Sequence, residues 1–281
     1  MTERVDAHQH FWTLSRGDYA WLTPDLESLY RDFGPADLAP LIARAGVGRT
    51  IAVQAAPTLS ETRFLLGLAE ETAFIAGVVG WVDFAAPDAA ATIVELAKNP
   101  ALLGLWPMIQ DIPDPDWMLG PRLAGAFEQL IASGLVFEAL VRPAHLPNVR
   151  RLLERYPDLR TVIDHGAKPD IAGGALEPWA RELESLARGS TAFCKLSGLV
   201  TEAGDDASTA RIAPYAERLL AAFGPERLIW GSDWPVVTLA CSYQDWCEMT
   251  ERLLASLDPK ERDAILGGTA ERCYGLGGRR R

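Results

Sequence analysis

The sequence predicts an α/β protein folded as a single (β/α)8 TIM barrel, with a long aromatic-rich loop after the first strand and an extra C-terminal helix. Short apolar runs alternate with amphipathic stretches along the chain, and no change of composition marks a linker. Runs such as Ile51–Val53 and Leu228–Trp230 are continuously apolar, as in parallel strands buried on both faces. The 281 residues are close to the roughly 250 of a typical barrel, so we expect one domain over residues 1–281.

The first half of the chain alternates predicted strands with helices. The first strand lies within Val5–Trp12, and the connection over residues 11–36 is rich in aromatic and turn residues. Connections longer than about 12–15 residues are often lids or binding loops. We expect Asp37 to cap a helix that Gly46 ends. The other elements expected here are strands 50–54, 74–82 and 102–109, helix 60–72 capped by Ser60, and helix 88–98.

The second half repeats the alternation after an acidic, proline-containing loop over residues 110–118. The rival fold is a doubly wound open sheet, but no glycine-rich phosphate turn follows the first strand. The elements expected in this half are strands 135–141, 160–164, 192–196 and 227–231, and helices 122–132, 147–155, 176–187, 207–223, 243–256 and 259–270.

Composition limits the possible partners. The net charge of −11 disfavours nucleic acid as a partner, because a binding face needs clustered Lys and Arg. The only basic cluster, Arg279–Arg281, is interpreted as a frayed tail. The longest apolar run, Phe74–Val82, is too short to cross a membrane. The four cysteines have no metal or redox spacing, and no signal peptide precedes them, so we expect reduced thiols in a cytoplasmic protein.

Two of the four histidines, His8 and His10, stand two residues apart on the first predicted strand. Side chains at that spacing point to the same side of a strand, where neutral imidazoles can bind a borderline cation such as zinc. A random His-X-His pair is more often an ordinary surface or core pair. The positions of the other polar residues favour the site.

In a (β/α)8 barrel, the carboxyl ends of the strands and the loops after them build the active site. His165 follows the sixth predicted strand and Asp233 the eighth, so both should meet the histidine pair at one mouth. Three imidazoles and a carboxylate can hold a zinc ion and leave a position for water. The polar residues expected at this mouth are His8, His10, Gln54, Asp83, Glu138, His165, Lys195 and Asp233.

Each member also has a structural interpretation. The sequences around His165 and Asp233 could be turns, in which a side chain bonds to the backbone. Lys195 could be a solvated charge, although a lysine inside an apolar strand is costly unless it faces a polar environment. Glu138 needs a partner, either Lys195 or Arg142. His145 precedes a helix beyond a strand end, and we interpret it as structural.

Motifs along nearly the whole chain resemble those of the amidohydrolase superfamily, and more narrowly its branch of sugar-lactone hydrolases. That branch includes the fuconolactonase and rhamnonolactonase type and is related to 2-pyrone-4,6-dicarboxylate lactonase. The motifs that carry the resemblance are His8–Trp12, Tyr19–Leu22, Arg31–Phe33, Val53–Ala55, Gly80–Asp83, Asp164–Pro169, Lys195–Leu199 and Trp230–Pro235.

The resemblance implies a (β/α)8 barrel with His8, His10, His165 and Asp233 as its central cluster. Many members of the superfamily hold one or two divalent ions, whereas some lactonases of this branch work without metal. The carboxylated lysine that bridges two ions in binuclear relatives has no counterpart here, so we expect at most one ion, with Zn2+ as the expected metal.

The expected reaction is addition of water to a lactone carbonyl. Asp233 is the predicted general base, and His165 and Lys195 are the other predicted catalytic residues. Rival reactions are those of a related metal-dependent decarboxylase and of an amide or ester hydrolase; a barrel that only binds carbohydrate is the non-enzymatic rival. The residues expected to contact substrate are Trp12, Trp21, Gln54, Trp106, Glu138 and Trp234.

Trp106 departs from the resemblance, since similar proteins often carry arginine at this point. An arginine can grip a carboxylate or a lactone oxygen through two parallel hydrogen bonds, whereas an indole offers one donor and a flat apolar face. If Trp106 faces the mouth, the pocket should prefer a less anionic or more apolar ring. The sequence therefore leaves the particular lactone open.

Overall fold

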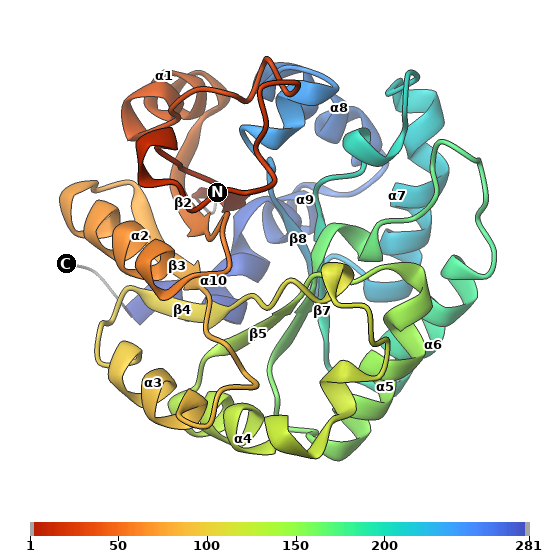
Figure 1. The fold of residues 1–281 in the computed structure, drawn as a ribbon. Coiled ribbons are helices and arrows are strands. Elements are labelled where there is room, and N and C mark those ends of the chain that lie inside the picture. The colour runs from red at the N-terminus through yellow and green to blue at the C-terminus, as the bar shows by residue number, and fades with distance from the viewer. Residues whose placement is uncertain (1–2, 279–281) are drawn as a thin grey trace.

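Eight parallel strands lie side by side in sequence order in the computed structural model, which describes residues 3–278. Helices surround the strands on all sides (Figure 1). The strands are β1 (Arg4–Gln9), β2 (Val47–Val53), β3 (Ile75–Gly80), β4 (Leu102–Leu105), β5 (Val136–Ala139), β6 (Thr161–Ile163), β7 (Phe193–Leu196) and β8 (Leu228–Trp230).

The barrel closes between its first and last strands. Gln9 forms a parallel bridge with Trp234, and the His10 amide donates to the Trp234 carbonyl at 2.7 Å. The Asp233 amide donates to the His8 carbonyl at 2.8 Å. This closure confirms the predicted (β/α)8 fold and brings two distant motifs together.

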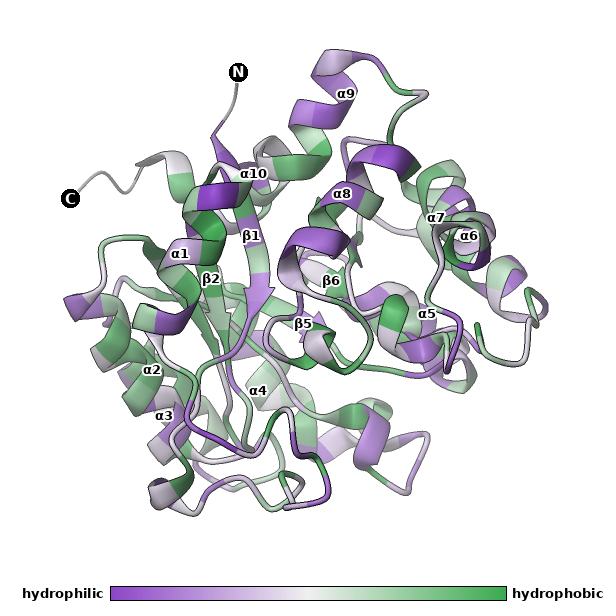
Figure 2. Cartoon of the chain, turned by 90° about the horizontal axis from the view of Figure 1, so that it is seen from above, coloured by the Kyte–Doolittle hydropathy of each residue, from purple (hydrophilic) through white to green (hydrophobic). Residues whose placement is uncertain are grey.

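Most of the helices bury one apolar face. Figure 2 shows hydrophobic and hydrophilic residues alternating along them, as expected for helices that pack on a barrel. The helices are α1 (Pro35–Ala45), α2 (Leu59–Glu71), α3 (Ala89–Leu96), α4 (Ala124–Ser133), α5 (Leu146–Arg155), α6 (Trp179–Gly189), α7 (Thr209–Phe223), α8 (Tyr243–Leu253), α9 (Pro259–Asp263) and α10 (Thr269–Tyr274).

Some predicted boundaries were wrong, each for a local reason. Gly34 is the N-cap of α1, and Asp37 bonds back to the Gly34 amide from the third helical position. Thr58, rather than Ser60, caps α2. The strand predicted to reach residue 109 ends at Leu105, just before Pro107, which has no amide to donate. The helix predicted over 259–270 is interrupted by a π-helical turn at Ala264–Gly268.

The apolar interior has two layers. The larger layer packs the helices onto the outside of the strands. The smaller layer fills the barrel, and it includes Val5, Ile51 and Val79 from the strands together with Cys273 and Tyr274 from α10. The C-terminal segment therefore supplies part of the barrel's interior packing, as an extra element beyond the eight repeats.

The long loop after β1 folds into a defined structure. Trp12 and Phe33 form an antiparallel bridge, and the Trp12 ring contacts the rings of Tyr19 and Trp21. Within residues 3–278, no helix is long and apolar enough to cross a membrane. The predicted frayed tail, Arg279–Arg281, lies outside the described residues.

Candidate active site

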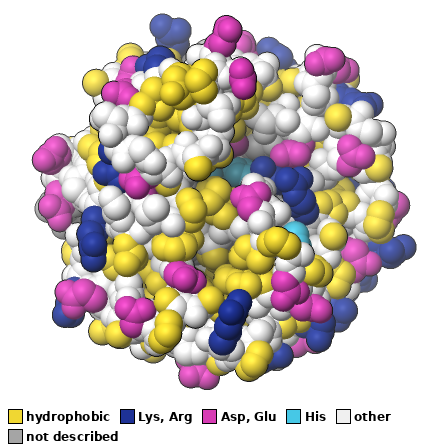
Figure 3. Space-filling view, in the orientation of Figure 1, with side chains coloured by type: hydrophobic (Ala, Val, Ile, Leu, Met, Phe, Trp, Pro, Cys, Tyr) yellow, Lys and Arg dark blue, Asp and Glu magenta, His cyan; other side chains and the backbone are white. Residues whose placement is uncertain are grey.

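A cavity of about 260 Å³ opens at the carboxyl ends of the strands. Figure 3 shows histidine side chains within a hollow on this face of the molecule. The cavity is lined by His10, His165 and Asp233 together with Trp21, Trp106 and Lys168. The predicted mouth of the barrel is therefore an accessible cavity that three of the predicted site residues line.

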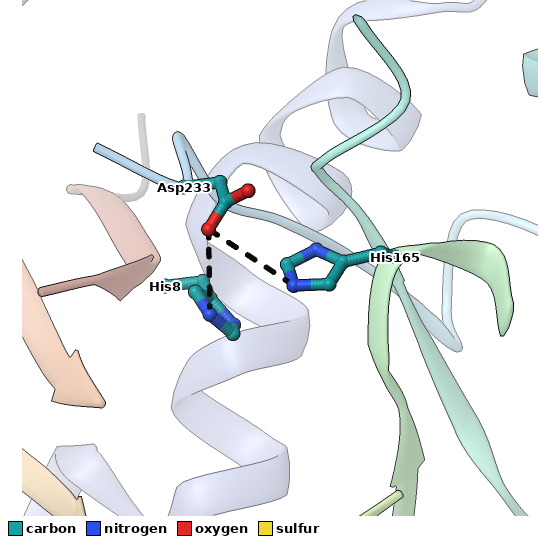
Figure 4. Close-up of side chains that lie close together, drawn as sticks. All are labelled: His8, His165 and Asp233. Carbon is teal, nitrogen blue, oxygen red and sulfur yellow. Dashed lines mark ion pairs between the residues drawn. The ribbon is translucent and has the colours of Figure 1, made fainter. Parts of the chain in front are cut away.

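The upper cluster consists of His8, His10, His165 and Asp233. The Nε2 atoms of His8, His10 and His165 lie 3.7, 3.3 and 4.0 Å from Oδ1 of Asp233. Figure 4 shows His8 and His165 both turned toward this oxygen. The Nε2 atoms of His8 and His10 are 3.1 Å apart, so the two imidazoles point to the same side, as their spacing predicts.

Unusual backbone conformations place two of these side chains. His165 has φ 49° and Asp233 has φ 60°, in the left-handed region that residues other than glycine adopt rarely. A Cβ atom on Gly198 would lie 2.5 Å from Nδ1 of His165, and one on Gly231 would lie 2.8 Å from Cβ of His8. Glycine is therefore required at both positions to leave room for the imidazoles.

Hydrogen bonds behind the rings orient two of the imidazoles. Nδ1 of His10 donates to the Val53 carbonyl at 2.9 Å, so the lone pair of the neutral ring is on Nε2, which faces His8 and Asp233. Nδ1 of His165 lies 2.9 Å from Oγ of Ser197. Ligand atoms of His8, His165 and Asp233 lie within 4.8 Å of one another, and His10 adjoins them. Nitrogen and carboxylate donors backed in this way fit a single zinc ion.

Burial and charge set the ionisation of the upper cluster. Burial lowers the pKa of His8 well below its usual value, with help from the charge of Lys195, and burial also lowers the pKa of His165. Burial alone would raise the pKa of Asp233, but the neighbouring imidazoles hold it far below its usual range. The cluster therefore combines the neutral imidazoles of His8 and His165 with an ionised carboxylate, which is the state that metal binding and proton abstraction need.

A second polar group, the lower cluster, lies against the far side of His8. It consists of Lys195, Glu138, Asp164 and Tyr274, all buried. The Lys195 ammonium pairs with Glu138, as one of the two sequence alternatives predicted, and also with Asp164. Burial raises the pKa of Glu138 above its usual value, against the opposing charge of Lys195. Burial acts in the same direction on Asp164, but Lys195 holds its pKa far below the usual range.

Several residues predicted to contact substrate lie away from the cavity wall. The Trp12 indole donates to the Arg31 carbonyl inside the first loop, and Trp234 packs on Phe11 and Phe33. The Gln54 amide donates to the Trp106 carbonyl at 3.0 Å, so it holds the backbone of Trp106 without lining the cavity itself. Glu138 belongs to the lower cluster. The residues with these supporting positions are Trp12, Gln54, Glu138 and Trp234.

Two other expected residues are displaced from the cavity. Lys195, predicted to be catalytic, is fully buried beneath His8 and does not line the wall. Asp83 is at the mouth but faces a neighbouring pocket of about 300 Å³. His145 is structural, as predicted, because its Nδ1 accepts from the Arg142 amide at 3.0 Å.

Trp21 and Trp106 do line the cavity, and sequence reasoning missed several of their neighbours. Lys168 follows His165 in the same left-handed turn and pairs with Glu202 at 3.3 Å. Gln110 and Asp111 come from the loop after β4. The only available signal was the Asp164–Pro169 motif, which contains Lys168 but does not show which way it points.

Comparisons with known proteins agree with this geometry. Residues 5–276 match the family described as Amidohydrolase. An L-fucono-1,5-lactonase of Burkholderia ambifaria is 47% identical, over 98% of this chain and 96% of the relative. An L-fucono-1,5-lactonase of Burkholderia multivorans is 41% identical, over 97% of this chain and 96% of the relative.

A solved structure gives the same result for the fold. It is an amidohydrolase from Burkholderia multivorans with bound zinc, and it superimposes with a TM-score of 0.93 at 39% identity. The match covers 98% of this chain and 99% of the other. The similarity therefore extends over the whole barrel.

Proposed function

The chain belongs to the amidohydrolase family, and from this membership we propose that it is a lactonase that hydrolyses a sugar lactone, with L-fucono-1,5-lactone as the first candidate substrate. The observation that carries the proposal is the meeting of three imidazoles and the ionised Asp233 in one cluster, of which all members except His8 line an open cavity. Two relatives more than 40% identical over nearly the whole chain are L-fucono-1,5-lactonases. The reaction is that of a carboxylic ester hydrolase.

Asp233 is the proposed general base. Its Oδ1 faces the imidazoles, which leaves Oδ2 to accept a proton from the attacking water. The water oxygen bonds to the carbonyl carbon, and the bond from that carbon to the ring oxygen then breaks. Asp233 returns the proton to the departing ring alcohol, so the product is an open-chain hydroxy acid.

The upper cluster is the proposed site of one zinc ion, with His8, His10, His165 and Asp233 as its ligands. Zinc, when bound, acidifies a water molecule and polarises a carbonyl group. Asp233 has a strongly lowered pKa, so it is a weak base toward ordinary water and benefits from a more acidic one. His10 and His165 line the cavity and lie within reach of a developing oxyanion.

Trp106 and Gln110 are proposed to form hydrogen bonds with the hydroxyl groups of the sugar ring. Both line the cavity, and within residues 3–278 neither the indole Nε1 of Trp106 nor Oε1 of Gln110 has a hydrogen-bond partner. An unpaired buried polar atom is costly, and a ligand that pairs with it removes that cost. One donor and one acceptor together suit a hydroxyl group, which both donates and accepts.

Lys168 supplies the positive charge on the cavity wall. Its ammonium pairs with Glu202 at 3.3 Å, and the side chain is only partly buried. A cation at this place favours the carboxylate of the product and the charge that develops on the lactone oxygen. Lys168 thus takes over part of the role that an arginine at position 106 would have.

A substrate panel tests the proposal. In a weakly buffered indicator assay, we expect acid release from L-fucono-1,5-lactone and slower release from stereoisomeric 1,5- and 1,4-lactones. The matching lactam and a carboxylated aromatic ring should be inert. Release of carbon dioxide, or preference for the lactam, would overturn the lactonase proposal in favour of a decarboxylase or an amidase.

A further inference from the structure

The lower cluster contains a second set of atoms arranged as metal ligands. Nitrogen and oxygen atoms of His8, Glu138 and Asp164 lie within 4.8 Å of one another, and all three side chains are fully buried. Taken by their donor types alone, one imidazole and two carboxylates could hold a second divalent ion beside the upper cluster.

The ammonium group of Lys195 already contacts each of these ligands. Nζ lies 3.0 Å from Nδ1 of His8, 3.1 Å from Oδ1 of Asp164 and 2.5 Å from Oε2 of Glu138. The ammonium therefore hydrogen-bonds to His8 and Glu138 and forms an ion pair with Asp164, so it contacts all three candidate ligands. We propose that Lys195 is a built-in cation that fills the second metal position, so that this barrel holds one metal ion at most.

The surroundings of Lys195 keep it in place. The hydroxyl of Tyr274 donates to Oε1 of Glu138, and the Tyr274 ring lies 6.0 Å from Nζ. Tyr274 belongs to α10, so the C-terminal helix contributes a buried side chain to the lower cluster inside the barrel. Lys195 is fully buried, and its charge is balanced by two carboxylates that pair with no other lysine or arginine within residues 3–278.

The same contact makes Lys195 a positioning residue for His8. When Nδ1 of His8 accepts from Lys195, the neutral ring carries its hydrogen on Nε2, which faces His10 and Asp233. Coordination through Nε2 needs the hydrogen on Nδ1, where it can reach Oδ1 of Asp164 at 3.4 Å. A hydrogen bond from Lys195 therefore favours the Nε2–H form of His8, which donates from Nε2. A hydrogen bond to Asp164 favours the Nδ1–H form, which can bind a metal ion through Nε2.

Metal counting tests the built-in cation directly and needs no substrate. The whole chain is incubated with zinc chloride, freed of loosely bound metal, and analysed for zinc per chain. We expect at most one equivalent in the unchanged protein and in Lys195→Met, which fills the space without a charge. Lys195→Ala opens the space and should bind one additional equivalent, and adding Glu138→Gln should remove it.

Two results would overturn the proposal. One is two tightly bound zinc ions in the unchanged protein, and the other is a folded Lys195→Ala variant that gains no metal. If that variant does not fold, nitrogen NMR of the metal-free, unchanged protein decides the matter. The proposal requires the Nε2–H form of His8, and an Nδ1–H form contradicts it. Because no lactone is used, failure here is distinguishable from failure of the lactonase proposal.

Discussion

The upper and lower clusters are neighbouring polar groups that differ both in residue type and in access to solvent. The upper cluster gathers ligand atoms around Asp233 at the floor of an open cavity. The lower cluster gathers two carboxylates around Lys195 and has no exposed side chain. His8 connects the two clusters, because its Nε2 faces Asp233 in the upper cluster and its Nδ1 faces Lys195 in the lower cluster. The comparison shows that the groups proposed to react are those that line the cavity, whereas the groups that support them are buried below it.

Removing the base from the upper cluster should have the largest effect on turnover. Asp233→Asn cannot accept a proton, so we expect kcat to fall about 100- to 10,000-fold. The melting temperature should change little, because the amide keeps the shape of the side chain. Steady-state kinetics and a thermal melt measure the two effects. Asp83→Asn, at an exposed aspartate outside the cavity, is the matched control.

Breaking the lower cluster should chiefly reduce stability. Lys195→Met leaves buried carboxylates without their cation, and we expect a loss of about 3–5 kcal/mol in the free energy of unfolding. Urea titration measures this loss. The double variant Lys195→Met/Glu138→Gln should recover part of it, since one uncompensated charge is then removed. Equal stability of the single variant and the unchanged protein would show that the ion pairs are not needed.

The sequence predicted the fold because burial and periodicity act locally. Continuous apolar strands between amphipathic helices indicate a parallel barrel, and barrel topology then brings His8, His165 and Asp233 to one mouth. The depth at which a side chain lies along the barrel axis, and therefore whether it reaches the cavity, is harder to predict. Glu138 and Lys195 are inward-facing strand residues like the ligands, but they lie one layer lower, where packing around Tyr274 decides their environment.

The loops limited the prediction of the cavity wall. Trp12 and Trp234 carry the aromatic faces expected of sugar-binding residues, yet contacts within the first loop bury both. Lys168 reaches the wall because residues 165–168 all have positive φ, which the sequence does not reveal for His165, Ala167 or Lys168. Such placements depend on tertiary contacts between distant segments rather than on local residue pattern.

Zinc should stabilise the protein through the upper cluster. Added zinc at about 100 times its Kd contributes about 2.7 kcal/mol, which we expect to raise Tm by about 5 °C. In His165→Gln the shift should fall by at least half, because one candidate ligand is lost. His145→Gln, which removes a histidine outside both clusters, should keep the full shift. Differential scanning calorimetry measures all three, and an unchanged shift in His165→Gln would place the ion elsewhere.

The smallest expected effect concerns recognition of the sugar. Trp106→Phe keeps the aromatic face but removes the unpaired indole N–H, so KM for a sugar lactone should rise about fivefold with kcat nearly unchanged. Trp117→Phe alters an indole in the neighbouring pocket and is the control. A rise in KM for both variants, or for neither, would remove Trp106 from the proposed hydroxyl contacts.

A crystal structure of the Asp233→Asn variant soaked with L-fucono-1,5-lactone tests the central claim most directly. The proposal predicts an intact lactone in the cavity of the upper cluster, with its carbonyl carbon next to residue 233 and a ring hydroxyl on Trp106. A lactone seated only in the pocket beside Trp81 and Trp117, or one whose carbonyl points away from the histidines, would contradict it.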